Sequence, residues 1–258
     1  MKYYNKTVIA FLKRTRRSIK RKVNRIKKKQ VASINRIIPF YGMSFNSQLR
    51  LFNKYYGEKV IYVDTKSIVR LSYIDISPNN FIGRFIFSGD WDLKHVEPLT
   101  SYSTPASRTV NHMFVKNLPF ETSEQYQEMV YLLKEGKPKR NCSSIEEIKK
   151  YGENLSNVFH NIRQEGYKSQ RELGGNNNDE IAIYIDRYGR LIAGNGGRHR
   201  IEIVRILNIK RIPVIVRGVH INWVRDCFSK YGRNIHYSIE RGLKAIERDG
   251  VREITYSN

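Results

Sequence analysis

The 258-residue sequence has few cysteines and no long apolar run. Its two cysteines, Cys142 and Cys227, lie far apart without CxxC spacing, so we expect reduced thiols and set a zinc site aside. No run of about 18 apolar residues suggests a membrane span, and no apolar segment with a small-residue cleavage site suggests a secretory signal. We therefore expect a cytoplasmic protein, peripheral at the membrane if its basic segment binds lipid.

Acidic residues are absent from the first 57 positions, which hold sixteen of the 47 lysines and arginines. The basic excess therefore belongs to an arm and linker, residues 1–57, rather than to the whole chain. Apolar residues recur at helical spacing over 7–38, which predicts a basic amphipathic helix. Residues 1–36 suit an anionic surface, with lipid headgroups favoured and nucleic acid as the alternative. A solvated helix that docks on its own domain is the plainer interpretation.

Familiar catalytic motifs are also missing: no GxSxG, HExxH, GxxxxGK[ST] or RNP-like pattern occurs. The histidines show no metal-ligand spacing.

Hydrophobic residues at 40% and aromatics at 12% nevertheless indicate a folded protein. We expect an α+β domain over 58–220 and a helical extension over 221–258. The expected strands are 59–63, 68–74, 81–87, 181–185, 190–193 and 212–216; the expected helices are 121–135, 144–151, 153–165, 198–208, 221–230 and 236–248; and 94–118 is expected as an irregular loop over a site.

A glycine-rich turn, Gly194-Asn195-Gly196-Gly197, joins the hairpin over 181–193 to the helix that follows. Small residues let the backbone approach a ligand closely, and a helix N-terminus offers N–H groups and partial positive charge to an anion. The helix then begins Arg198-His199-Arg200, and arginine can bind phosphate with two hydrogen bonds. The pattern predicts a phosphate site at Gly196–Arg200; the alternative is a helix start whose basic side chains satisfy nearby carboxylates.

This stretch resembles the ParB-like nucleotide-binding domain shared by ParB partition proteins, sulfiredoxins and free-serine kinases. The likeness is good over 155–216 and loose over 59–92. It includes Leu155, Val158, Ile162, Glu165-Gly166 and the polar box Tyr167-Lys168-Ser169-Gln170. The resemblance implies a small α+β domain that holds nucleotide phosphates at Gly196, Gly197, Arg198, His199 and Arg200, with Lys168, Ser169 and Gln170 facing the nucleotide.

Two departures from the family pattern limit which of the family's activities are expected for this chain. Arg198 stands where sulfiredoxins have their catalytic cysteine, so sulfinic-acid reduction is not expected. Arg198 also replaces the glutamate of the ParB turn Gly-Glu-Arg-Arg. About forty residues after Val216 leave little room for the DNA-binding domain of partition proteins.

Two aspartates, Asp90 and Asp92, follow an expected strand at an i, i+2 spacing. A carboxylate there could hold Mg²⁺ beside the nucleotide phosphates or deprotonate an acceptor hydroxyl. Equally, a turn after Gly89 could use both aspartates to satisfy backbone N–H groups.

Three functions follow from these patterns. The favoured one is a kinase-like phosphotransferase that uses ATP or another nucleoside triphosphate with Mg²⁺ on an acceptor hydroxyl, for example that of a membrane lipid or glycan. In that hypothesis Asp90 and Asp92 are both the catalytic and the metal-binding residues. The second is a nucleic-acid-binding ParB-like protein, a nuclease or a nucleotide-regulated DNA binder. The third is a nucleotide sensor without catalysis.

Overall fold

The computed structural model describes residues 43–55, 59–72, 85–94, 96–100, 104–175, 179–232 and 234–249. Within these residues the chain folds as α+β, with seven α-helices and one mixed sheet of seven strands. The predicted arm helix over 7–38 lies outside the described residues. No helix in the described part of the chain is long and apolar enough to cross a membrane.

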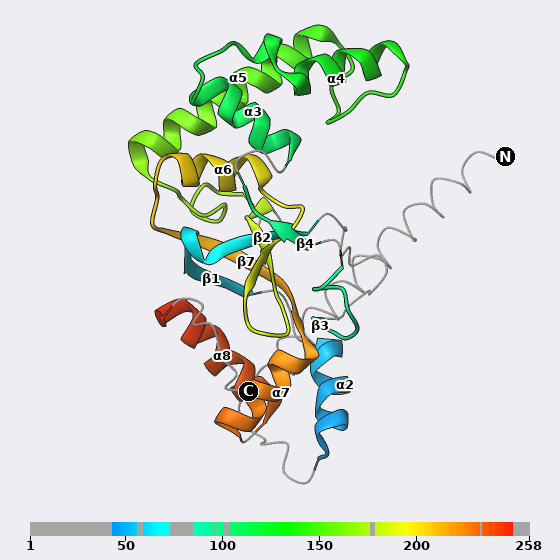
Figure 1. Cartoon of the computed structure of the whole chain (residues 1–258), viewed down its shortest axis with the longest axis vertical. Coiled ribbons are helices and arrows are strands. Elements are labelled where there is room, and N and C mark those ends of the chain that lie inside the picture. Colours follow the sequence, from blue (N-terminus) through cyan, green and yellow to red (C-terminus); the bar gives the residue numbers. More distant parts are fainter. Residues whose placement is uncertain are drawn as a thin grey trace, which may run out of the picture.

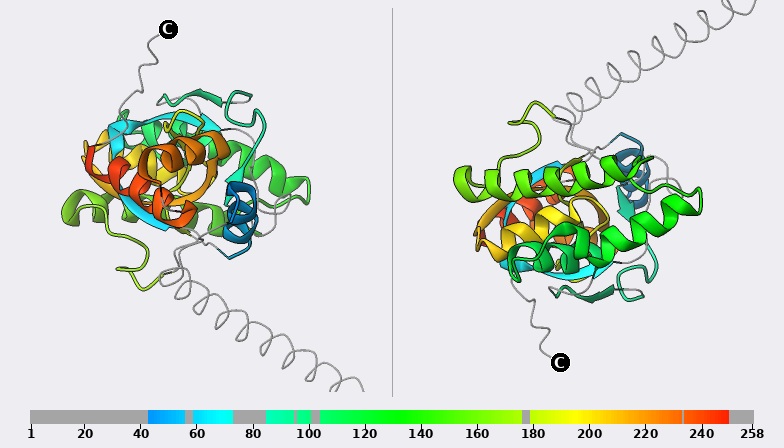
Figure 2. Two further views of the ribbon diagram at one scale, coloured as in Figure 1. Left: turned by 90° about the horizontal axis from the view of Figure 1, so that it is seen from below. Right: turned by 90° about the horizontal axis from the view of Figure 1, so that it is seen from above.

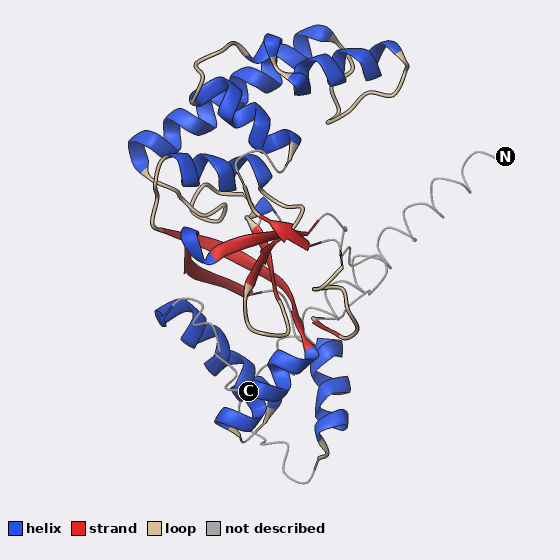
Figure 3. Ribbon diagram, in the orientation of Figure 1, coloured by secondary structure: helices blue, strands red, loops and turns tan. Residues whose placement is uncertain are grey.

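The sheet lies between two groups of helices (Figure 3). Its order is β1-β7-β5-β6-β2-β4, and β3 pairs with the end of β7. β7 is the longest strand; it runs antiparallel to β1 and parallel to both β5 and β3. The strands are β1 (Lys59–Asp64), β2 (Ile68–Ser72), β3 (Ile86–Phe87), β4 (Val96–Pro98), β5 (Ala182–Ile185), β6 (Leu191–Ala193) and β7 (Arg211–His220). The predicted strands over 59–63, 181–185, 190–193 and 212–216 are confirmed.

Four helices, α3 to α6, form the group at the top of Figure 1, and α2, α7 and α8 form the group below the sheet. Seen from above, α5 and α4 are the outermost helices of the upper group (Figure 2). The helices are α2 (Phe45–Tyr55), α3 (Pro105–Phe114), α4 (Glu124–Lys134), α5 (Ile145–Glu165), α6 (Arg198–Ile206), α7 (Ile221–Tyr231) and α8 (Ile235–Asp249). The predicted helices over 121–135, 198–208, 221–230 and 236–248 are confirmed to within a few residues.

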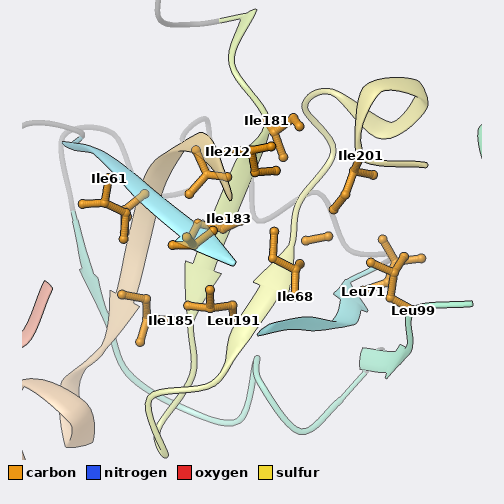
Figure 4. Packing of buried hydrophobic residues seen from close by; sticks show 14 of the residues in the cluster. Ile61, Ile68, Leu71, Leu99, Ile181, Ile183, Ile185, Leu191, Ile201 and Ile212 are labelled. Atoms are coloured by element: carbon orange, nitrogen blue, oxygen red, sulfur yellow. The ribbon is translucent and has the colours of Figure 1, made fainter. Parts of the chain in front are cut away.

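Branched aliphatic side chains of the central strands form the core (Figure 4). Ile183, Ile185 and Leu191 are completely buried. All four residues of β5 and all three of β6 are buried, as expected where helices cover both faces of a sheet. Each such side chain contributes roughly 1.5–3 kcal/mol relative to its exposed state. The β5–β6 hairpin is therefore a rigid support for the two loops at its ends.

The same hydrophobic cluster includes helices that were expected to be appendages. Phe52 of α2, Trp223 of α7 and Ile239 of α8 are buried in it. Residues 45–55, expected as part of a linker, are thus a packed helix, and α7 and α8 are integral to the fold.

The expectation of an irregular loop over 94–118 is wrong. Residues 96–98 form β4, and residues 105–114 form α3. Thr104 and Ser107 make a capping box at the start of α3, and Pro105 occupies its first turn. The proline and hydroxyl residues that suggested a loop are helix-start signals in this structure.

The two helices expected over 144–151 and 153–165 are one 21-residue helix, α5. Gly152 does not interrupt it. A Cβ at this glycine would lie 2.3 Å from Cδ1 of Phe120, so the glycine lets the Phe120 ring pack directly on the α5 backbone.

Candidate functional site: the start of α6

The glycine-rich turn lies flat against the start of β5. Gly194 N donates to Ala182 O at 2.8 Å, and Ala182 N donates to Gly196 O at 3.2 Å. A Cβ at Gly197 would lie 2.9 Å from Cα of Ile181, and its φ is +74°. Both the contact and the left-handed backbone require glycine at Gly197.

The N-terminus of α6 differs from the start of every other α-helix in the described residues. Gly197, its N-cap, has no side chain and makes no capping hydrogen bond. Each of the other six α-helices has a side chain that accepts from a first-turn N–H. These caps are Ser44, Thr104, Ser123, Ser144, His220 and Asn234. A helix start without a cap directs N–H groups outward with partial positive charge, the arrangement that binds anions.

Arg198 connects this turn to the end of β2. Its Nη2 donates to Ser72 O at 3.0 Å and also to Asn195 Oδ1. The guanidinium is therefore held at this turn by protein oxygens.

His199 faces the α4–α5 side of the turn. Its Nε2 is 3.0 Å from Gln125 Oε1, and Gln125 Nε2 donates to Tyr151 OH at 3.2 Å. Burial, together with the positive charges of Arg140 and Arg200, lowers the pKa of His199 to about 3. His199 is thus a neutral ring that joins the turn to the helical layer, and at neutral pH it adds no positive charge for a phosphate.

Arg200 faces a buried carboxylate, Glu180, which is 1% exposed. Both oxygens of Glu180 accept from Gln170 N, at 3.0 and 3.1 Å, and Tyr167 OH donates to it at 3.4 Å. Burial raises the pKa of Glu180, while the hydrogen bond from Gln170 N and the charge of Arg200 act in the opposite direction. Burial likewise raises the pKa of Tyr167. Glu180 was not among the site residues predicted from the sequence, where it directly precedes an expected strand. An acid at the edge of an apolar strand was the signal that could have identified it.

The polar box contributes less to the turn than the resemblance implies. Lys168 Nζ pairs with Glu165 at 2.5 Å. Ser169 N and Oγ both donate to Glu172, at 2.7 and 2.6 Å. Of the three predicted residues, Gln170 is the one that the structure links to Arg200, through its backbone N–H and Glu180.

Space beneath the turn is small. A cavity lined by Gly194, Gly196, Arg198, Thr104 and Ser107 has a volume of about 10 Å³, which is room for about one water. Asn111 of α3 donates to Glu202 of α6 at 3.1 Å, so α3 is held against α6. A phosphate must therefore approach the outer side of the first turn.

Asp90 and Asp92 lie at the opposite end of the hairpin from this turn. Both pair with Arg187, at 2.8 Å from Asp90 and 2.7 Å from Asp92. Arg187 belongs to the turn after β5, whereas Gly196 lies beside Ala182 at the beginning of β5. Four strand residues separate the two ends by roughly 13 Å. The structure does not bring the predicted catalytic and metal residues to the predicted phosphate site.

The contacts of Asp92 identify its role. Its side chain is completely buried and accepts from Arg187 N at 2.9 Å and from the Arg187 guanidinium. Burial would raise the pKa of Asp92, but the hydrogen bonds from Arg187 and the nearby His220 outweigh burial and lower it. An aspartate saturated with donors in this way is a poor Mg²⁺ ligand. No cluster of three or more metal-ligating side chains occurs among the described residues.

The hairpin turn has a second carboxylate of the same kind. Asp186, fully buried, accepts from Arg190 at 2.7 Å and from Arg70 at 3.3 Å. Its Oδ1 also accepts from the backbone N–H groups of Tyr188 and Arg190, both at 2.8 Å. This end of the hairpin is a set of matched ion pairs: Arg187 with Asp90 and Asp92, and Asp186 with Arg190 and Arg70.

No family model, curated protein or solved structure matches the chain.

Proposed function

We propose that the chain binds a nucleotide through its phosphates at the outer side of the first turn of α6. The observation that carries this proposal is the absence of a side-chain cap at Gly197, whereas the other described α-helices all have one. Arg200 supplies charge-assisted hydrogen bonds beside the helix start. The ParB-like resemblance of 155–216 supports a nucleotide rather than another anion.

The reaction class that we propose is phosphoryl transfer from ATP or another nucleoside triphosphate to an acceptor hydroxyl. Glu180, unlike Asp90 and Asp92, is a carboxylate close to the turn and to Arg200. A buried carboxyl with a raised pKa suits proton transfer. Mg²⁺, when bound with the nucleotide, would neutralise the phosphate charge; the described residues provide no dedicated set of ligands for it, so no step of our account depends on the metal.

Thermal-shift measurements with ATP, ADP, CTP and GTP, with and without Mg²⁺, test the binding proposal. A ligand at 100 times its Kd should add about 2.7 kcal/mol to the free energy of unfolding. A nucleotide should stabilise the parent protein and fail to stabilise Arg200→Ala. If none of the four nucleotides changes the unfolding temperature, the proposal is wrong.

The transfer proposal has a separate test. Glu180→Gln should retain nucleotide-induced stabilisation and lose turnover by about 10²-fold, the lower range for losing acid–base help. The matched control is Asp90→Asn, which changes a surface carboxylate at the other end of the hairpin. This variant should have the same rate of nucleotide turnover as the parent.

A further inference from the structure

Two glutamates of α8 hold this helix against β1. Its two glutamates, Glu240 and Glu247, are seven residues apart and both contact β1. Glu240 pairs with Lys59 at 2.7 Å, and Glu247 accepts from Tyr62 N at 3.0 Å. Ile239 and Leu243 are buried in the core on a neighbouring side of the helix. The acids of α8 are thus used to dock the helix on the sheet.

The side of α8 turned away from the buried Ile239 and Leu243 carries three basic residues, next to the two glutamates. Arg241, Lys244 and Arg248 are exposed and recur at i, i+3 and i+7, so they share one stripe of the helix surface. The stripe is about 10 Å long at 1.5 Å per residue. The guanidinium of Arg241 lies 5.7 Å from the ring centre of Tyr231 at the end of α7. We call these three residues the α8 stripe.

We propose that the α8 stripe binds the phosphodiester backbone of a nucleic acid. Long cationic side chains in a row match consecutive phosphates, and phosphate contacts of this kind position a protein without reading sequence. A membrane surface is the less suitable partner, because an interfacial helix needs apolar side chains beside its charges. The exposed large hydrophobic residues in the described part of the chain lie elsewhere, none of them on α7 or α8.

The α8 stripe is separate from the start of α6. α8 belongs to the helical group below the sheet in Figure 1, and α6 to the group above it. The proposal therefore does not rest on nucleotide binding, and a nucleotide and a nucleic acid could occupy the protein together.

The test uses the full chain with Arg241→Gln, Lys244→Gln and Arg248→Gln combined. The matched control combines Lys116→Gln, Lys134→Gln and Lys137→Gln, which removes three exposed charges from the upper helical group. Binding to a 20-bp DNA duplex is measured by fluorescence anisotropy across a series of KCl concentrations. At 0.1 M salt the stripe variant should bind on the order of 10²-fold more weakly, and its log–log salt slope should fall by about 2.7.

The control variant should keep the salt slope of the parent. The double variant Arg241→Gln/Lys244→Gln should show about two thirds of the fall in slope expected for the triple variant. Thermal unfolding checks that each variant folds. A stripe variant that binds DNA like the parent overturns the proposal. So does one that loses binding to vesicles containing phosphatidylserine while DNA binding is unchanged, because the partner would then be a membrane.

Discussion

Basic residues lie at both ends of the β5–β6 hairpin, but their surroundings differ. At the turn after β5, Arg187 is neutralised by Asp90 and Asp92, and Arg190 by Asp186. At the other end, α6 begins without a side-chain cap. Charged residues that are matched in pairs brace a structure, whereas donors that remain available at a helix start can receive a ligand. The following predictions test this distinction, from the largest expected effect to the smallest.

Asp92→Asn should destabilise the protein most. The change leaves the partly buried Arg187 guanidinium without its main counter-charge, and breaking a buried ion pair costs about 3–5 kcal/mol. Urea unfolding at pH 7 measures the loss. The folded fraction should still bind nucleotide with the affinity of the parent. A loss below about 1 kcal/mol would show that the ion pair does not brace the hairpin.

Arg200→Ala should weaken nucleotide binding. Losing a charge-assisted hydrogen bond should weaken nucleotide binding by about 1.5–3 kcal/mol, which is roughly 10- to 150-fold. Isothermal titration calorimetry measures the affinity, and Arg163→Ala on α5 serves as the control. Unchanged affinity in Arg200→Ala would mean that the phosphate site has been misplaced.

His199 should make stability depend on pH. Its pKa is lowered from 6.5 to about 3 in the folded protein, so below pH 6.5 the unfolded chain binds a proton that the folded chain does not. Stability is then fully present above pH 6.5 and falls by about 1.4 kcal/mol per pH unit as pH drops toward 3. Urea unfolding of the parent and His199→Gln at pH 7, 6 and 5 measures the difference. Parallel pH dependences in the two proteins would refute a neutral, enclosed His199.

Asp90→Asn should have the smallest effect. The Asp90 side chain is 57% exposed, and exposed ion pairs contribute about 0–1 kcal/mol. Its stability in urea should stay within that range of the parent. A loss as large as that of Asp92→Asn would remove the contrast between the buried and the exposed partner of Arg187.

Periodicity predicted most of the strands and helices, because apolar residues at spacing two or near 3.6 determine which faces become buried. It could not predict α3, because Thr104, Pro105 and Ser107 occur in loops as readily as in capping boxes. It also split α5 at Gly152, whose partner Phe120 is far away in the sequence.

For the site, local sequence predicted the turn and helix start correctly as structure, since glycines before a basic helix form a local pattern. The roles of Asp90 and Asp92 depended on Arg187, about 95 residues away. The environment of Glu180 likewise depends on the hydrogen bond that it accepts from the backbone N–H of Gln170. A single sequence does not reveal such pairings.

Titration of ATP into isotopically labelled protein, followed by backbone amide resonances, tests the central claim most directly. The resonances of Arg198, His199 and Arg200 should shift progressively, because a phosphate would accept from the N–H groups of this turn. Those of Tyr188 and Arg190, whose N–H groups already donate to Asp186, should remain in place. Shifts confined to 186–190, with 198–200 unchanged, would contradict the account and place the ligand at the end of the hairpin that we regard as structural.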